Sequence, residues 1–215
     1  MADITFINLN MLHIRYEGSY ERELHLPLGL LYLTSVLEEA GIEVDFRDYQ
    51  RCEADDPFDL DVFADFCADC APIVGISCMA NLLPFALLAT QRLAERYPDR
   101  TIVLGGVGAK AVETAVLERF PWIDLIAHGE AERAIVPLVR ALRDGGNLAE
   151  VPGIFYRRPD GTIASTPPPE RISELDQLPR PAYHRVDLGV YDAYGMISSR
   201  GCPSECTFCS VAPVW

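Results

Sequence analysis

The chain has 215 residues, of which 49% are hydrophobic and 23% charged, and its formal net charge is −14. Length and composition suit a globular chain that buries a full core, while the acidic excess lacks the positive footprint of a nucleic-acid-binding protein. No apolar run approaches the roughly 20 residues of a membrane span and the start has no signal-peptide core, so we expect a cytoplasmic chain with no nucleic-acid partner and no membrane span.

Residues 1–147 alternate short apolar segments with segments of helical period. Strands are expected at 3–9, 42–49, 72–77, 101–104 and 123–127, where apolar and β-branched residues cluster. Helices are expected at 27–39, 58–70, 82–97, 110–119 and 131–144. Residues 11–26 lack a clean period and predict a loop. This order predicts a doubly wound α/β domain, with one parallel sheet and helices on both faces.

The texture changes after this first domain. Residues 153–156 and 162–165 flank a Pro-Asp-Gly turn and predict a β-hairpin. The proline-rich stretches that follow predict a connector, so 148–192 is interpreted as hairpin and linker. A new strand is expected at 194–199, and 193–215 is interpreted as the incomplete start of another domain.

Ligands of open parallel sheets bind beyond the carboxyl ends of the strands. Three small, polar or glycine-rich loops follow predicted strands there. They comprise Ser77, Cys78, Met79, Ala80 and Asn81; Gly105, Gly106, Val107 and Gly108; and Gly129 with Glu130. Glycine lets backbone approach a ligand closely, although every strand-to-helix turn favours small residues, and that alternative stays open. A dinucleotide fingerprint is weak, because the third glycine of its spacing is missing.

Three cysteines, Cys202, Cys206 and Cys209, lie within eight residues near the end of the chain. Such thiols in an unexported chain with an odd cysteine count favour metal binding over disulfides. An iron–sulfur cluster normally takes four cysteines, so three leave one iron open to another ligand. The alternative, a zinc knuckle, needs a fourth ligand that does not follow. The other close pair, Cys67 and Cys70, is interpreted as core thiols.

With Phe208, this spacing becomes Cys-x-x-x-Cys-x-aromatic-Cys, which resembles the radical S-adenosylmethionine (SAM) enzymes. The resemblance implies a [4Fe-4S] cluster on the three cysteines, SAM chelated to the open iron, and Phe208 in the cofactor site. Residues 27–33, 74–79, 103–106 and 128–132 resemble the amino-terminal domain of the cobalamin-dependent members. This implies a corrin resting on the three loops. No histidine lies in an Asp-x-His-x-x-Gly motif, so we expect no histidine ligand to cobalt from that motif.

The resemblance implies methyl transfer to an unactivated carbon or phosphorus centre, through methylcobalamin and a 5′-deoxyadenosyl radical. It also implies a small-molecule or peptide substrate and an electron donor such as flavodoxin or ferredoxin. Alternatives are a non-methylating cyclase or ring-rearranging enzyme, a cobalamin-binding module without activity, and an electron carrier. Because a β/α barrel takes roughly 200–250 residues, we expect most of the radical SAM domain to be missing and assign no catalytic residue.

Overall fold

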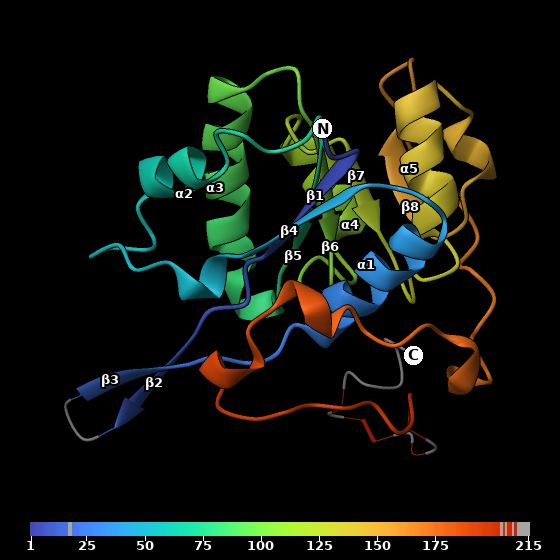
Figure 1. Cartoon of the computed structure of the whole chain (residues 1–215). Helices are drawn as coiled ribbons and strands as arrows, with labels where there is room; N and C mark the ends of the chain where they lie inside the picture. The colour runs from blue at the N-terminus through green and yellow to red at the C-terminus, as the bar shows by residue number, and fades with distance from the viewer. Residues whose placement is uncertain (17–18, 203, 205, 208, 210–215) are drawn as a thin grey trace.

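Five parallel strands form the centre of the structure, a computed structural model that describes residues 1–16, 19–202, 204, 206, 207 and 209 (Figure 1). Across the sheet the strands follow the order β4 (Val44–Asp48), β1 (Ile4–Asn8), β5 (Ile73–Ser77), β6 (Thr101–Gly105) and β7 (Leu125–Ala127). All neighbours in this set pair in parallel. The predicted doubly wound sheet is confirmed.

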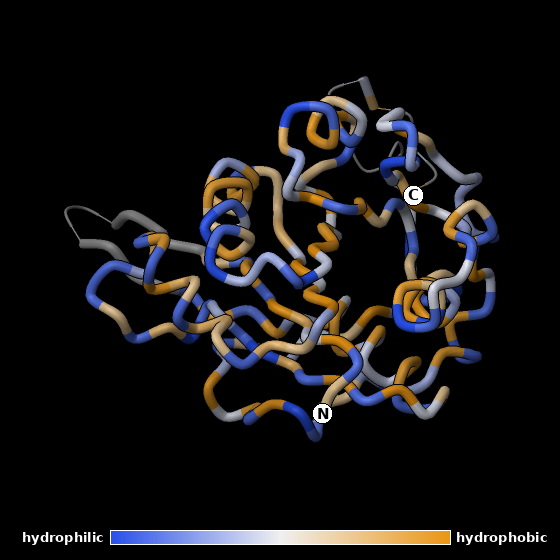
Figure 2. The backbone as a smooth tube through the Cα atoms, turned by 90° about the horizontal axis from the view of Figure 1, so that it is seen from above, coloured by the Kyte–Doolittle hydropathy of each residue, from blue (hydrophilic) through white to orange (hydrophobic). Residues whose placement is uncertain are grey.

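The helices cover both faces of the sheet and divide the core in two. One apolar cluster joins the sheet to α1 (Leu28–Glu39) and α5 (Ile135–Asp144), and the other joins it to α2 (Leu60–Phe66), α3 (Leu83–Arg96) and α4 (Glu113–Arg119). Figure 2 shows hydrophobic stretches in the interior of the molecule and hydrophilic stretches in many of its outer turns and loops. In the described residues, no helix has both the length and the apolar character to cross a bilayer.

The helices begin and end where the sequence carries signals for it. Asp59 caps α2 by accepting hydrogen bonds from the backbone N–H groups of Asp61 and Val62, and Gly145 ends α5 in the left-handed conformation, at φ 70°. The helices are shorter than predicted by one to four residues at several ends. Cys67 and Cys70 therefore lie just after α2. The backbone N–H of Cys67 donates to the Ala64 carbonyl, and that of Cys70 donates to the Cys67 carbonyl, so the chain continues in turns where the helix ends.

A topological switch lies between β1 and β5. The chain leaves β1 for α1 on one face of the sheet and leaves β5 for α3 on the opposite face. Two connections that diverge in this way open a crevice beyond the carboxyl ends of the two strands. The fold therefore provides a ligand position at the same edge as the three predicted loops.

The predicted hairpin is confirmed as β8 (Ile154–Arg157) and β9 (Ile163–Ser165). It does not stand apart, because β8 pairs antiparallel with β7 and extends the central sheet. At its turn, Asp160 accepts a hydrogen bond from the backbone N–H of Thr162 at 2.9 Å.

Two predictions about secondary structure are wrong. The expected loop at 11–26 contains β2 (Leu12–Tyr16) and β3 (Ser19–Glu23), a separate two-stranded ribbon that projects from the body in Figure 1. Its hydrogen bonds are local, so its sequence does not need the apolar alternation of a buried sheet. The expected strand at 194–199 is absent, and only an isolated bridge joins Ala193 to His25.

The predicted connector packs back on the first domain. Its short 3₁₀ turns are η3 (Leu148–Glu150), η4 (Leu175–Gln177), η5 (Tyr183–Arg185) and η6 (Leu188–Val190); two others, η1 (Tyr49–Arg51) and η2 (Ala80–Leu82), lie within the first domain. Ser35 donates a hydrogen bond to the Arg180 carbonyl at 2.6 Å, and the backbone N–H of Ala182 donates to the Leu31 carbonyl at 3.0 Å. Tyr191 donates to Asp48 at 2.6 Å. These bonds fix the path of the chain toward Arg200.

Substituting Gly75→Ala in β5 is expected to lower the free energy of unfolding by about 1–3 kcal/mol, the usual cost of overpacking. A Cβ at this position would lie 2.8 Å from the Phe6 ring on β1. The matched control is Gly29→Ala in the first turn of α1, where a Cβ meets nothing within 4 Å. Chemical denaturation measures both variants, and equal stabilities would contradict this packing.

Candidate functional site

An apolar cavity of about 280 Å³ lies between the sheet and the face formed by α1 and α5. Its floor comes from β1, β5, β6 and β7, and its sides come from the two helices. The apolar side chains in the wall are Ile4, Phe6, Leu30, Leu33, Ile73, Val103, Ile126, Ile135, Leu138, Val139 and Leu142. This deep cavity suits an apolar or aromatic group.

A second, broader cavity of about 720 Å³ lies over the carboxyl ends of β1, β5 and β6. Its wall is more polar and includes Asn8, Asn10 and Asn81. The two cavities share the wall residues Gly29, Leu30, Ser77, Gly106 and Val107. They therefore adjoin at the topological switch and together suit a ligand with a broad polar part and an apolar extension.

The structure brings most of the predicted loop residues to these cavities. The wall of one or both includes Ser77, Cys78, Met79, Asn81, Gly105, Gly106, Val107, Gly129 and Glu130. Two predicted residues lie elsewhere: Ala80 is exposed in η2, and Gly108 is buried beneath the loop that follows β5. Phe208 lies outside the described residues.

The glycines of the predicted loops have different roles. A Cβ on Gly106 would lie 2.7 Å from the Cys78 carbonyl oxygen, and one on Gly108 would lie 2.5 Å from the Cys78 Sγ. These two glycines let the loops after β5 and β6 pack together, so for them the packing alternative holds. Gly129 has a φ of 77°, and a Cβ there would meet no atom within 4 Å. The absence of a side chain at Gly129 therefore leaves its backbone accessible from the cavity.

An unpaired acceptor lies in the wall of the broad cavity. Asn8 donates to Asp48 at 2.8 Å, and Asn10 donates to Asn8 at 2.9 Å. The Oδ1 atom of Asn10 is buried and, among the described residues, has no hydrogen-bond partner. A buried acceptor normally finds a donor, so this atom suits an amide N–H of a ligand. These asparagines are in none of the three predicted loops, although β1 ends at the same edge of the sheet as the strands that those loops follow.

A polar cluster lies beside the deep cavity. The Nδ1 of His128 is 3.1 Å from a carboxylate oxygen of Glu113, whose residue is 7% exposed, and the ring packs edge-on against Phe155 at 5.7 Å. The Nζ of Lys110 lies 3.4 Å from Nε2 and 3.5 Å from Nδ1 of the same imidazole. His128 therefore contacts a buried carboxylate and a lysine, and Lys110 belongs to none of the predicted loops or motifs.

A buried ion pair connects the end of the chain to this site. Arg200 lies 2.5 Å from Glu132 and 3.3 Å from Glu130, and all three side chains are at most 14% exposed. The Arg200 guanidinium also lies over the Tyr32 ring, at 5.7 Å from its centroid. Glu130 in turn accepts a hydrogen bond from the backbone N–H of Ile172. The loop after β7 thus holds both the connector and the segment that leads into Cys202.

The three cysteines of the metal prediction are not gathered in the structure. Cys202 and Cys206 are exposed and Cys209 is half-buried, with its backbone N–H donating to the Cys206 carbonyl. Among the described residues, no three His, Cys, Asp or Glu side chains lie close enough to hold a metal ion. Because metal binding and loop folding are coupled, the donor set fits a cluster that orders the loop, and the assignment stays a prediction.

The other cysteines near the sheet have the properties of packed thiols. Cys67, Cys70 and Cys78 are buried. Burial raises the pKa of the Cys78 thiol to about 11, so this thiol stays protonated and a poor nucleophile near neutral pH. The hydrogen bond between Cys67 and Cys70 raises the pKa of the first thiol and lowers that of the second.

The sequence matches the B12 binding domain family over residues 21–139. It is 33% identical to an anaerobic magnesium-protoporphyrin IX monomethyl ester cyclase of Synechocystis sp., over 96% of this chain and 42% of that protein. It is 31% identical to the hopanoid C-3 methylase of Methylococcus capsulatus, over 86% of this chain and 35% of that protein. The chain therefore spans less than half the length of these curated relatives.

The fold resembles that of a solved structure, the cobalamin-dependent S-adenosylmethionine radical enzyme OxsB in its apo form. The TM-score is 0.68 at 22% sequence identity, and the match covers 93% of this chain and 26% of OxsB. At this identity the likeness shows the shared fold.

Replacing Arg200→Met is expected to lower the free energy of local opening around residues 193–202 by about 3 kcal/mol, because it leaves the buried Glu132 without its cation. Hydrogen exchange of the backbone amides in this segment measures the effect. The matched control is Arg133→Met. Arg133 lies next to Glu132 in the loop after β7, and its ion pair with Glu170 is more exposed. Breaking this pair is expected to lower the free energy of local opening by less than about 1 kcal/mol. Equal protection in the two variants would show that the Arg200 pair does not hold this segment.

Proposed function

Because the chain belongs to the B12 binding domain family and its relatives include a cobalamin-dependent radical SAM methyltransferase, we propose that its two adjoining cavities hold cobalamin and that the segment from Arg200 to Cys209 carries the [4Fe-4S] cluster. The observation that carries the proposal is the pairing of a broad, partly polar cavity with a deep apolar one at the topological switch. Cobalamin has matching parts: a flat corrin rimmed with amides and a nucleotide tail that ends in an aromatic base.

The residues of the chain bind and orient the cofactor. Ser77, Met79, Val107 and Gly129 would hold the corrin, and the buried acceptor of Asn10 would take a hydrogen bond from one of its amides. The aliphatic side chains between the sheet and the two helices would hold the aromatic base and exclude water from it. Burying such a base removes apolar surface from water, at about 25 cal/mol per Å². Bound cobalamin supplies the cobalt centre that carries a methyl group.

The ion pair of Arg200 sets the position of the cluster relative to this cavity. Arg200 is itself in the wall of the deep cavity, with its partners Glu130 and Glu132. Cys202 follows two residues later, so the cluster would be held next to the cobalamin. Such closeness is what two cofactors that act on one substrate require.

The proposed reaction is methyl transfer to an unactivated carbon or phosphorus centre of a small-molecule or peptide substrate. Its support is the similarity to relatives such as the hopanoid C-3 methylase. In this proposal an electron donor such as flavodoxin or ferredoxin reduces the cluster, and SAM binds at its open iron.

A second candidate is a non-methylating oxidative cyclisation with the same cofactors. The observation in its favour is the similarity to a cyclase relative over 96% of this chain.

Incubated anaerobically with hydroxocobalamin, the chain is expected to retain about one corrin per chain through gel filtration, measured by its visible absorbance. Leu33→Trp replaces an aliphatic side chain in the wall of the deep cavity with a bulky indole ring. This variant is expected to raise the dissociation constant for the corrin at least tenfold. Leu88→Trp on the exposed side of α3, where the residue is 52% exposed, is the matched control. Corrin binding that is unchanged in Leu33→Trp, or missing in the wild type at saturating ligand, contradicts the assignment.

The reaction class is tested with the whole protein, loaded with cluster and reduced corrin. Without any acceptor substrate, a methyltransferase is expected to convert SAM into about one equivalent of S-adenosylhomocysteine per bound corrin. Chromatography of the products separates this compound from 5′-deoxyadenosine, and protein without corrin is the control. 5′-Deoxyadenosine with no S-adenosylhomocysteine would instead support the cyclase.

A further inference from the structure

Lys110 is the only lysine among the 18 lysine and arginine residues of the chain, and it lies in the wall of the deep cavity. It belongs to the turn that joins β6 to α4, between Gly106 and Glu113. The next residue, Ala111, has a φ of 69° and is the one non-glycine residue with positive φ in the part of the chain that the structure describes. An L-residue in this region costs roughly 1–2 kcal/mol, so the surrounding structure holds this turn in an unfavourable conformation.

The contacts of Lys110 leave its charge uncompensated. Its Nζ lies 3.4 Å from Nε2 and 3.5 Å from Nδ1 of His128, and a carboxylate oxygen of Glu113 lies 3.1 Å from the same Nδ1. Within the described ranges, no carboxylate is in ion-pair distance of Lys110. Arg200, the arginine in the same wall, is paired with two carboxylates. Of these two cations in the cavity wall, Lys110 is therefore the one that can form an ion pair with a bound anion.

The donors of Lys110 set the chemistry of that anion. An ammonium group has three N–H donors, and a neutral imidazole accepts one of them. The other two remain for a second acceptor, and a charge-assisted bond to a phosphate oxygen is the strong choice. Glu113 is not within ion-pair distance of Lys110, and its carboxylate oxygen is instead 3.1 Å from the Nδ1 of His128.

The geometry points to Lys110 as the group that binds the phosphodiester in the nucleotide tail of cobalamin. This inference rests on the proposed function. The side chains of the corrin are neutral amides, whereas the phosphodiester between the corrin and the base carries a negative charge. Gly106 and Val107, a few residues before Lys110, belong to the walls of both cavities. Lys110 thus lies near the junction of the two cavities, where the link between corrin and base would run.

The test compares cobalamin with cobinamide, a corrin that lacks the phosphodiester, ribose and base. Lys110→Gln is expected to raise the dissociation constant for cobalamin about tenfold or more, as for a lost hydrogen bond to a charged group. It is expected to leave the dissociation constant for cobinamide within about twofold of the wild type. Lys110→Arg, which keeps the charge, is expected to restore most of the cobalamin affinity.

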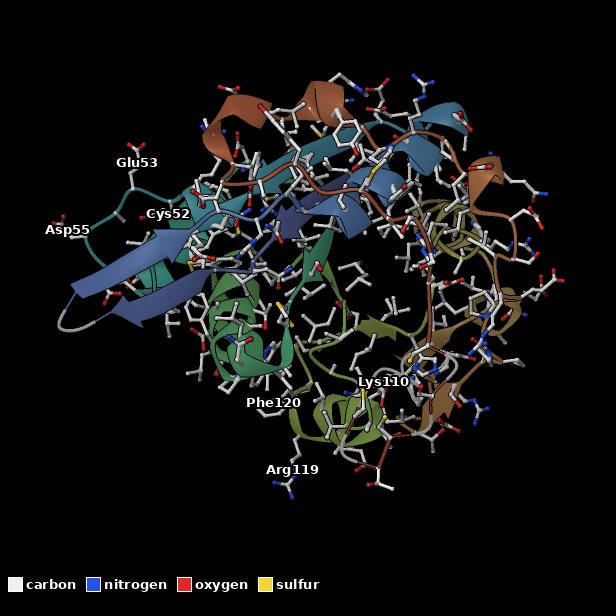
Figure 3. All side chains as sticks on the ribbon, turned by 90° about the horizontal axis from the view of Figure 1, so that it is seen from below. Cys52, Glu53, Asp55, Lys110, Arg119 and Phe120 are labelled. Carbon is white, nitrogen blue, oxygen red and sulfur yellow. The ribbon has the colours of Figure 1, made fainter. Side chains whose placement is uncertain are left out.

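The matched control is Arg119→Gln, which removes one positive charge from the end of the following helix. Figure 3 shows Arg119 projecting outward from the molecule, whereas Lys110 lies within its outline. This control is expected to bind both corrins as the wild type does. Thermal unfolding of every variant shows whether the fold is kept.

The outcomes separate the inference from the proposed function. Equal loss of both corrins in Lys110→Gln, or loss of neither, overturns the phosphodiester contact while cobalamin binding stands. Failure of the wild type to bind either corrin overturns the proposed function itself. As a second readout, cobalamin is expected to protect Lys110 from acylation by an amine reagent, measured by mass spectrometry, and cobinamide is expected to protect it less. Equal protection by the two would contradict the contact even if the variants were unstable.

Discussion

The site depends on the opposite directions that the chain takes after β1 and β5. Because α1 covers one face of the sheet and α3 the other, no helix closes the space beyond these two strand ends. Both cavities share wall residues there. The loops after β6 and β7 add their residues to the same edge, since parallel strands end on the same side. Reversing either connection would cover the crevice and leave those loops with nothing to bind.

Buried charge adds a second constraint. Taking Arg200, Glu130 and Glu132 out of water costs several kcal/mol per ion unless they pair well, and the structure pairs them across 68 residues of sequence. Such an arrangement tolerates few alternatives, because displacing one member leaves the others unpaired. It therefore specifies where the last described segment lies more strictly than an apolar contact of similar size would.

The sequence predicted those parts of the fold and site that are encoded locally. Apolar periodicity predicted the β–α order, and the loop residues Ser77, Gly106 and Gly129 follow from where strands end. The ribbon of β2 and β3 was missed because its pairing is local and needs no buried face. The contact of Lys110 with His128 and the pairing of Arg200 with Glu130 and Glu132 were missed for the opposite reason, since these contacts join residues distant in sequence. The sequence analysis placed the glycines in a ligand site, whereas Gly106 and Gly108 allow two loops to pack together at Cys78.

The hydrogen bonds of the connector to α1 and to Asp48 have a consequence for how the cysteine segment is placed relative to the cavities. A flexible tether as long as residues 148–192 would leave its ends roughly 35–40 Å apart on average. The cysteine segment would then reach the cavity by diffusion, at an effective concentration set by the length of the tether. Because the connector is fixed along α1, the cysteine segment is held at a defined distance from the cavity and does not reach it by diffusion. The separation is a property of the fold, and changing the length of the exposed turns in the connector should leave it nearly unchanged.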